Sequence, residues 1–445
     1  MHIYRKNYLS LISTVLKRPG CKTLRILFLI PLLYFSSTPV MAYLDPGSGS
    51  ILLYFLLGIF ATLIYSIKSL FFTLSMWFSH FFTKDGINKN VKKNIVFYSE
   101  GGKYWYVFKP VIEALNNLNI ECSYYTSDKF DEGLKFQATK FDSFFIGNSS
   151  FSLISLNYLQ AKVLVTTTPQ IEVMQFKRSK KTDYFVYLMH SPIDALFYNK
   201  FAFDYFDAVM CTGRYQIDSI RALEEKRGTK KKELLETGLT YYDVMKESKN
   251  NVKQKLTTVL IAPSWSNKSV LTNNISKLVE VIEVLLEQNY AVILRPHPQM
   301  LKIKEKEMIN LEKRLSSYES LKIDKLPSGI NSMNRADVMI SDLSGIIFDF
   351  FFVFKKNILV FDAEVNKAGF EAEDINKTPW ELELINDIAT KVSLENIDKI
   401  PSIIDRVIKV SNTQKSNKII RDSIFNYGST GKVAARQLAN ILEKI

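Results

Sequence analysis

The pattern of hydrophobic and polar positions changes near residue 94. Before that point, two long apolar runs are separated by a polar turn; after it, short apolar runs alternate with amphipathic segments. Short buried runs that alternate with helical patterns are typical of the strands and helices of a parallel α/β sheet. The pattern therefore predicts a membrane-associated N-terminal part followed by α/β domains.

Residues 1–42 resemble a secretory leader. A basic start precedes the apolar run 26–35, and Val40-Met41-Ala42 is typical of a signal-peptidase site. We expect a signal peptide or a signal-anchor here, and the sequence leaves both open.

Residues 43–83 predict a transmembrane or interfacial anchor. The second apolar run, 51–67, sits at the short end for a membrane span, and the aromatic segment 70–82 suits an interfacial helix. Lysines follow the second run and basic residues precede the first, so the positive-inside rule favours a hairpin with both ends in the cytoplasm. We therefore expect the protein at the cell membrane, with residues 84–445 in the cytoplasm. The alternative, a secreted protein whose second run is a core helix, is disfavoured because that run has no charged face.

Two series of strand and helix patterns follow, separated by the polar segment 245–256, which predicts a linker. We place one Rossmann-like domain at residues 94–244 and a second at residues 257–445. Strands are predicted at 95–98, 122–125, 143–146, 163–166, 185–189 and 208–211, and then at 258–262, 291–294, 321–323, 338–340 and 358–361. The main helices are predicted at 109–118, 275–287, 308–315, 401–410 and 431–442. Two such domains joined by a linker predict a cleft, with ligands beyond the carboxyl ends of the strands.

The turn Ser341-Asp342-Leu343-Ser344-Gly345 follows the predicted strand 338–340 and precedes the apolar segment 346–354, which predicts a buried helix, although its composition also permits a strand. Free backbone N–H groups, hydroxyls and the helix dipole at such a turn suit a phosphate. The alternative is an ordinary helix cap without a ligand.

A second turn of this kind, Arg295-Pro296-His297-Pro298, follows the predicted strand 291–294. Its prolines fix the backbone, and an arginine and a histidine held at a strand end suit an anionic phosphate. The alternative is a salt bridge with a capped turn. Having both turns in one domain favours a diphosphate site.

His190 ends the predicted strand 185–189, where an imidazole is placed to remove a proton from a hydroxyl. A structural histidine is the alternative. Asp194 and Asp207 are candidates to orient it. In the second domain, Pro263-Ser264-Trp265 follows a strand and offers an indole for stacking on a nucleobase, unless Trp265 is a core residue.

Composition narrows the choice of partner. The net charge is +13, of which residues 1–42 supply six positive charges, and such a balance suits an anionic membrane or a phosphorylated substrate. The basic runs 176–181 and 226–232 lack the aromatic interleaving of a nucleic-acid module, so we expect no nucleic-acid partner. The three scattered cysteines have no metal spacing, and nothing in the sequence requires a metal or another cofactor. Nicotinamide, P-loop and serine-hydrolase motifs are absent from the sequence.

Taken together, these motifs resemble those of the CDP-glycerol glycerophosphotransferases, the teichoic-acid primases and polymerases. The resemblance covers roughly residues 94–440 and rests on His190, on 262–265, on 295–298, and on 341–345 followed by Phe348-Asp349-Phe350. It implies a GT-B fold, with a CDP-linked donor in the C-terminal domain and an acceptor at the N-terminal one. The residues implied for the donor phosphates are Arg295, Ser341, Asp342, Ser344 and Gly345, with Pro263, Ser264 and Trp265 near the nucleotide and His190 and His297 as catalytic residues. Familiar members carry Trp-His-Gly where this chain has Met189-His190-Ser191, so the acceptor, and with it the polyol, can differ.

The resemblance implies a membrane-associated transferase that moves glycerol phosphate, or a related polyol phosphate, from a CDP-linked donor to a lipid-linked or glycan hydroxyl in cell-envelope synthesis. Two alternatives stay open. One is a GT-B glycosyltransferase that uses a nucleotide sugar for capsule or lipopolysaccharide; the other is a non-enzymatic scaffold for envelope assembly.

Overall fold

The computed structural model describes residues 57–60, 62–63, 66, 92–148, 150–250, 254–264, 269–326, 328–361 and 368–445. The chain divides into two compact units, Met1–Thr83 and Lys84–Ile445. In the first unit only a few residues between 57 and 66 are described, and they are helical. The predicted leader 1–42 and nearly all of the predicted anchor 43–83 lie outside the described residues. Among the residues that are described, no helix is both long and apolar enough to cross a membrane.

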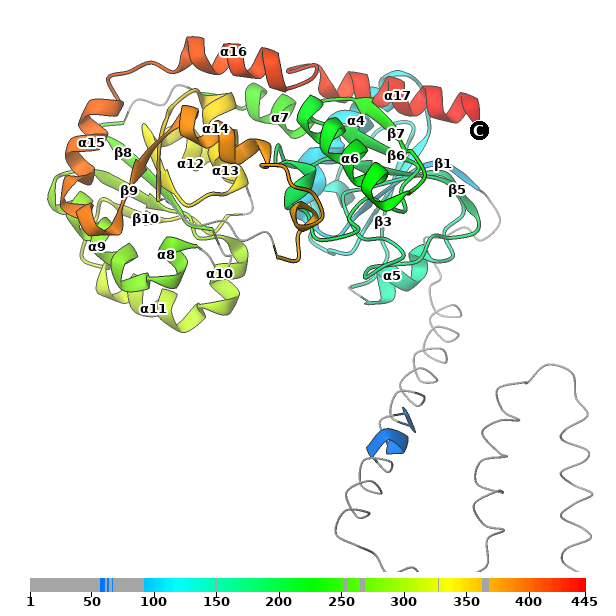
Figure 1. Ribbon diagram of the computed structural model, residues 1–445, viewed down its shortest axis with the longest axis horizontal. Coiled ribbons are helices and arrows are strands. Elements are labelled where there is room, and N and C mark those ends of the chain that lie inside the picture. The colour runs from blue at the N-terminus through cyan, green and yellow to red at the C-terminus, as the bar shows by residue number, and fades with distance from the viewer. Residues whose placement is uncertain are drawn as a thin grey trace, which may run out of the picture. The chain divides into compact units, whose positions relative to one another are not determined.

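The second unit begins with a sheet of seven parallel strands in the order β3-β2-β1-β4-β5-β6-β7 (Figure 1), on which we define the N-lobe. Its strands are β1 (Lys93–Ser99), β2 (Cys122–Thr126), β3 (Phe141–Phe145), β4 (Ala161–Thr166), β5 (Thr182–Leu188), β6 (Ala208–Cys211) and β7 (Glu233–Glu236). β1, β4 and β5 are buried along most of their length, as expected of central strands covered on both faces.

A second sheet of six parallel strands, in the order β10-β9-β8-β11-β12-β13, defines the C-lobe. Its strands are β8 (Thr258–Ala262), β9 (Ala291–Leu294), β10 (Leu321–Ile323), β11 (Val338–Ser341), β12 (Asn357–Phe361) and β13 (Ala389–Val392). This is the strand order of a Rossmann sheet, whose direction of growth reverses between β8 and β11. The carboxyl ends of those two strands are therefore the expected ligand position.

Helices lie between the strands of both sheets. In the N-lobe they are the 3-10 turns η1 (Gly102–Tyr104), η2 (Glu132–Leu134) and η3 (Ala195–Phe197) and the helices α4 (Trp105–Asn117), α5 (Ser150–Leu156), α6 (Arg214–Arg227) and α7 (Tyr241–Glu247). In the C-lobe they are α8 (Val270–Asn273), α9 (Ile275–Glu287), α10 (Pro298–Ile303), α11 (Glu305–Arg314), α12 (Ile330–Arg335), α13 (Gly345–Asp349), the π-helical η4 (Phe350–Phe354), the 3-10 turn η5 (Glu371–Glu373), α14 (Trp380–Ile388), the 3-10 segment η6 (Leu394–Lys399), α15 (Ile400–Val407) and α16 (Thr413–Ser423). The last helix of the chain is α17 (Thr430–Lys444).

The predicted α/β architecture is confirmed, and most predicted strands agree with the structure to within a few residues. The edge strands β7 and β13 are missing from the prediction, because each has only four residues, ELLE and ATKV, of which two are charged or polar, so neither forms an apolar run or an alternating pattern. The segment 346–354 is helical, as predicted, and its second half widens into a π-helix.

The end of the predicted second domain, 257–445, needs correction. Helix α17 lies beside α4 (Figure 1). Its residues Ala434, Ala435 and Leu438 are buried in the same core cluster as Ile95 and Phe97 of β1. The chain thus returns to the N-lobe after α16. Gly238 makes room for this crossing, because it has φ 96° and a Cβ there would lie 2.2 Å from the carbonyl oxygen of Phe425.

A strap from the C-lobe, which we define as residues 368–381, also lies on the N-lobe. Phe370 bridges to Asn199, and the indole of Trp380 stacks on Tyr215 with ring centroids 4.0 Å apart. Asp194 and the strap exchange hydrogen bonds, since the Trp380 N–H donates to Asp194 Oδ2 at 3.1 Å and the Asp194 N–H donates to Glu381 Oε1 at 3.1 Å. Asp194 is therefore an interlobe connector, and the predicted role of orienting His190 is wrong for it. The predicted role of orienting His190 is also wrong for Asp207, whose Oδ2 pairs with Arg178 Nη2 at 2.6 Å within the N-lobe.

Candidate functional site

The turn 341–345 begins at the reversal point of the C-lobe sheet. The Ser341 hydroxyl donates to the carbonyl of Ala262, the last residue of β8, at 2.6 Å. Asp342 is buried and accepts hydrogen bonds from the Ser264 N–H at 3.1 Å and the Ser269 hydroxyl at 2.6 Å. Both side chains are therefore occupied in building the loop. What these residues can still offer a phosphate is the backbone of the turn.

Ser264, predicted beside the nucleotide, is part of this construction. Its residue is buried next to Pro263, and its carbonyl accepts a hydrogen bond from the Thr272 hydroxyl. Trp265, the predicted stacking residue, lies outside the described residues. Pro263 and Ser264 thus shape the loop, and the sequence prediction of an indole at this place stays a prediction.

Gly345 brings the turn against the N-lobe. A Cβ built on Gly345 would lie 3.2 Å from Ser191 Oγ and 3.6 Å from Ile193 Cδ1. Ser191 directly follows His190, so the turn predicted to bind the donor in the C-lobe lies against the residue next to the histidine predicted in the N-lobe. The half-buried Ser344 caps α13 beside it without a side-chain hydrogen bond to the helix.

His190 is half-buried within a group of tyrosine rings. Its ring lies edge-on to Tyr104 with centroids 5.1 Å apart, and its Nδ1 lies 3.3 Å from the Tyr187 hydroxyl. Burial, followed by the positive charge of Lys103, lowers the pKa of His190 to about 4. The imidazole is therefore uncharged at neutral pH, with one nitrogen held by Tyr187.

His297 is the N-cap of α10. Its Nδ1 accepts a hydrogen bond from the Gln299 N–H at 3.1 Å, so the neutral ring carries its proton on Nε2. Burial, then the charges of Lys103 and Arg295, lowers the pKa of His297 to about 4. A neutral imidazole with a protonated Nε2 is a hydrogen-bond donor suited to a phosphate oxygen.

Lys103 is the residue that the sequence analysis missed. It belongs to η1 of the N-lobe, is exposed, and places its ammonium 4.6 Å from the centre of the Tyr104 ring. Its charge acts on His190 of its own lobe and on His297 of the other. A lysine that influences one imidazole on each lobe lies where the two lobes face each other. The only sequence signal was the preceding Gly101-Gly102 at a strand end.

Arg295 is held within the C-lobe by an ion pair. Its Nη1 lies 2.7 Å from Asp324 Oδ2, and the arginine side chain is 12% exposed. Gly329 lies against it, since a Cβ there would be 2.8 Å from Arg295 Nε. The structural alternative, a salt bridge with a capped turn, is thus observed at 295–298. Arg295 still acts on the site through its positive charge, which lowers the pKa of His297.

The carboxyl group of Asp349, in the motif Phe348-Asp349-Phe350, has an unusually high pKa. Burial raises the pKa of its carboxyl to about 7. The neighbouring Tyr242 hydroxyl is buried and forms no geometrically good hydrogen bond within the described part of the chain. The carboxyl therefore changes charge near neutral pH, close behind the turn 341–345.

The site thus combines an uncharged histidine from each lobe, the Lys103 ammonium, whose charge acts on both, and the turn 341–345. Positive potential with neutral donors suits a phosphorylated ligand that spans both lobes. Together with two Rossmann-like sheets and a C-terminal helix that returns to the first, this arrangement is that of a GT-B-like fold.

Residues 216–426 match the family model described as CDP-Glycerol:Poly(glycerophosphate) glycerophosphotransferase. This match confirms the resemblance predicted from the motifs, and it indicates an enzyme of the CDP-glycerol glycerophosphotransferase type. The match includes the C-lobe loops of His297 and 341–345 and begins after His190.

Solved structures show the same fold. A structure of the wall teichoic acid polymerase TagF with CDPG is 15% identical, with a TM-score of 0.54 over 87% of this chain and 98% of that chain. The UDP-GlcNAc 2-epimerase of Methanocaldococcus jannaschii with UDP-GlcNAc and UDP is 14% identical, with a TM-score of 0.52 over 79% of this chain and 100% of that one. No curated protein matches the chain.

Proposed function

We propose that this protein transfers glycerol phosphate, or a related polyol phosphate, from a CDP-linked donor to a hydroxyl of a lipid-linked or glycan acceptor. The observation that carries the proposal is the family match over 216–426, which covers the lobe with His297 and the turn 341–345. The proposed role of His190 at the acceptor hydroxyl rests on its position in the structure, because His190 lies outside the matched segment.

In the proposed reaction the acceptor oxygen attacks the β-phosphorus of the donor in line. The new bond joins that oxygen to the β-phosphorus, the bond between the β-phosphorus and the bridging oxygen breaks, and CMP leaves with that oxygen. His190 takes the acceptor proton on Nε2, which requires the tautomer whose Nδ1–H donates to the Tyr187 hydroxyl.

The remaining groups act on charge. Lys103, the Nε2–H of His297 and the backbone N–H groups of 341–345 offset the negative charge on the transferring phosphate and on CMP. Arg295 contributes through its potential while Asp324 holds it in place. A pKa near 4 is low for a base at neutral pH, and a bound diphosphate raises the pKa of both imidazoles, because negative charge stabilises the protonated ring.

The proposal includes a place at the cell membrane, with the two lobes in the cytoplasm. It is supported by the apolar run 51–67, the aromatic segment 70–82 and the lysines that follow them. A lipid-linked acceptor would lie at that surface. Proteoliposomes made with the full chain and digested from outside would test the orientation.

The test of function is CMP release. Purified full-length protein with CDP-glycerol and a lipid-linked acceptor should release CMP in proportion to acceptor consumed. No release with CDP-glycerol or a related CDP-polyol would contradict the proposal, as would full activity in His190→Ala. A thermal-shift screen separates the alternatives, because stabilisation by a UDP-sugar alone favours the glycosyltransferase, and no stabilisation by any cytidine or uridine nucleotide favours the scaffold.

A further inference from the structure

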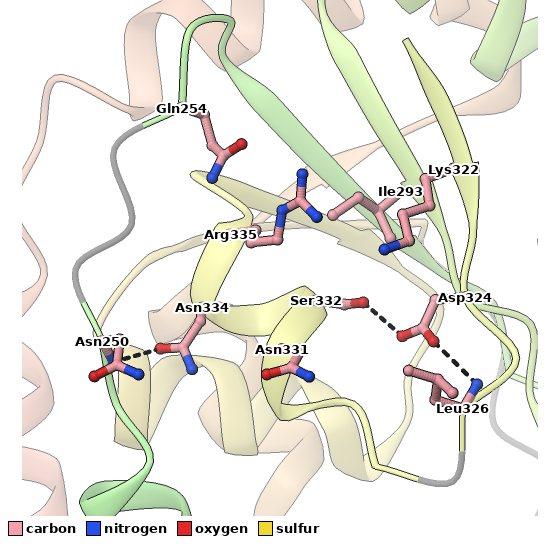
Figure 2. Close-up of a pocket in the computed structure, with 10 residues that line it drawn as sticks. All are labelled: Asn250, Gln254, Ile293, Lys322, Asp324, Leu326, Asn331, Ser332, Asn334 and Arg335. Carbon is pink, nitrogen blue, oxygen red and sulfur yellow. Dashed lines mark hydrogen bonds between the residues drawn. The ribbon is translucent and has the colours of Figure 1, made fainter. Parts of the chain in front are cut away.

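A cavity of about 370 Å³ lies on the C-lobe, lined by Asn250 and Gln254, by residues of and after the strands β9 and β10, and by helix α12 (Figure 2). Its lining includes none of His190, His297 and the turn 341–345. The cavity is therefore separate from the proposed transfer site.

The sheet explains why the space is open. β10 is the edge strand, and α12 packs against β8 and η4, so Lys322 of β10 stays exposed beside α12 while Ile293 of β9 is buried. Lys322 is the register partner of Ile293 on β9, which puts their side chains next to each other on this face. Figure 2 shows Ile293 between the side chains of Lys322 and Arg335.

The charged side chains of the cavity that have no ion-pair partner among the described residues are both positive. Lys322 and Arg335 are exposed, and within the described ranges neither side chain has a hydrogen-bond or ion-pair partner. The one acid in the lining, Asp324, is already bound by Arg295 Nη1 at 2.7 Å and by the Ser332 hydroxyl at 2.5 Å. An anion in the cavity would therefore meet two available cations and no available carboxylate.

The rest of the lining limits the size and polarity of the ligand. The amides of Gln254 and Asn331 offer donors and acceptors, and the largely buried Ile293 adds a small apolar contact between the cations. A volume of about 370 Å³ is at the lower end for small-molecule pockets. A phosphate that carries a short polyol matches this lining: the phosphate at the cations, the hydroxyls at the amides, and the carbon chain on Ile293.

We propose that this cavity is a second binding site, for a glycerol phosphate group that is not the one being transferred. That group is either a unit of the anionic polymer already made or the headgroup of an anionic lipid with the same chemistry. The choice of polyol depends on the proposed function; the preference for a phosphate follows from Lys322 and Arg335.

The cavity also shares a wall with the transfer site. Asp324 lines it and at the same time holds Arg295, whose charge acts on His297. A ligand here can therefore occupy the protein together with the donor, with Asp324 fixed between them.

The test is equilibrium binding to the full-length protein, which needs no turnover. The probe is a synthetic tri(glycerol phosphate), measured by calorimetry on the wild type, on the double variant Lys322→Glu/Arg335→Glu and on a charge-matched control, Lys306→Glu/Lys313→Glu on α11. We expect the cavity variant to bind at least tenfold more weakly than the control, with CDP-glycerol affinity within about twofold of wild type in both. Equal loss in the two variants, or no binding by the wild type to any probe, overturns the proposal.

Vesicles separate the two sources of the group. Binding to phosphatidylglycerol vesicles that exceeds binding to phosphatidylserine vesicles, and that is lost in Lys322→Glu/Arg335→Glu, assigns the site to a lipid headgroup, whereas binding of the soluble trimer assigns it to the polymer. Equal binding of the two vesicle types with no trimer binding overturns it. Trimer binding without CMP release contradicts the proposed function alone.

Discussion

A side chain on Gly345 would place its Cβ 3.2 Å from the hydroxyl oxygen of Ser191. These two residues belong to different lobes. Ser191 follows the predicted base His190, and Gly345 ends the turn predicted to bind the donor phosphates. Gly345→Ala should therefore hold the lobes slightly apart, at a cost of about 1 kcal/mol, or about fivefold in kcat/KM for the CDP-linked donor. Steady-state kinetics on the purified variant would measure this.

Ser191→Ala supplies the control, because it removes the oxygen that the new methyl group meets. The double variant Gly345→Ala/Ser191→Ala should recover most of the loss relative to Ser191→Ala alone. If the double variant is as impaired as the sum of the single variants, the contact does not set the distance between the lobes.

Lys103 should matter for both imidazoles. In Lys103→Gln we expect kcat/KM to fall roughly 10²-fold, as when one electrostatic contact to the transition state is removed. The pKa values of His190 and His297 should both rise, since the ammonium lowers them in the native protein. Histidine NMR titration follows the pKa values, and CMP release follows the rate.

The matched control for Lys103 is Lys129, which is also exposed and lies over the ring of the next residue, Phe130, at 4.8 Å. Lys129→Gln should leave both the rate and the histidine pKa values unchanged. A rise in the pKa of His190 but not of His297 would show that Lys103 serves only its own lobe.

Donor binding should take up protons. Burial and positive charge lower the pKa of His297 and His190 to about 4 in the empty site, and a diphosphate raises both values. Because the bound state then holds more protons, CDP-glycerol should bind more tightly as the pH falls from about 6.5 toward about 5. Calorimetry in buffers of different ionisation enthalpy measures the uptake, and His297→Gln should reduce it. Affinity that is flat across this range would contradict the account.

Arg227 should hold the strap, residues 368–381, on the N-lobe. This arginine is 10% exposed and pairs with Asp204 Oδ1 at 2.9 Å, Asp374 Oδ2 at 2.7 Å and the fully buried Glu371. Arg227→Ala leaves that carboxylate without its partner, so the free energy of unfolding should fall by about 3–5 kcal/mol in denaturant melts.

Arg214, on the same helix, is the comparison, since its pair with Glu236 is exposed on both sides. Arg214→Ala should cost less than about 1 kcal/mol. Similar losses in the two variants would mean that Arg227 does not hold the strap through a buried charge.

The regular part of the fold could be predicted because each lobe repeats one local pattern. The runs that form β6, β8 and β9 are short, apolar and bounded by turn residues, so strand period and burial agree. Helix α17 shows the limit, because its amphipathic pattern predicts a helix correctly and says nothing about which lobe it packs on.

The place of a candidate residue at a strand end could be predicted from the sequence, whereas its role in the site stays a prediction. His190, His297 and the turn 341–345 lie at strand ends, as the sequence indicates, and their neighbourhood follows from the topology. Lys103 could not be found this way, because an exposed lysine after a glycine pair is ordinary in sequence and gains meaning only from the lobe opposite. Conversely, the sequence suggests that the side chains of Ser341 and Asp342 are available to a phosphate, whereas in the structure they form hydrogen bonds with Ala262 and Ser269.

The most direct test separates donor binding from transfer. CDP-glycerol affinity and single-turnover CMP release should be measured on the wild type, His190→Gln and His297→Gln. The account predicts that His190→Gln binds the donor nearly as well as wild type but releases CMP 10²- to 10⁴-fold more slowly, while His297→Gln loses affinity as well. Wild-type rates of CMP release in His190→Gln would contradict it.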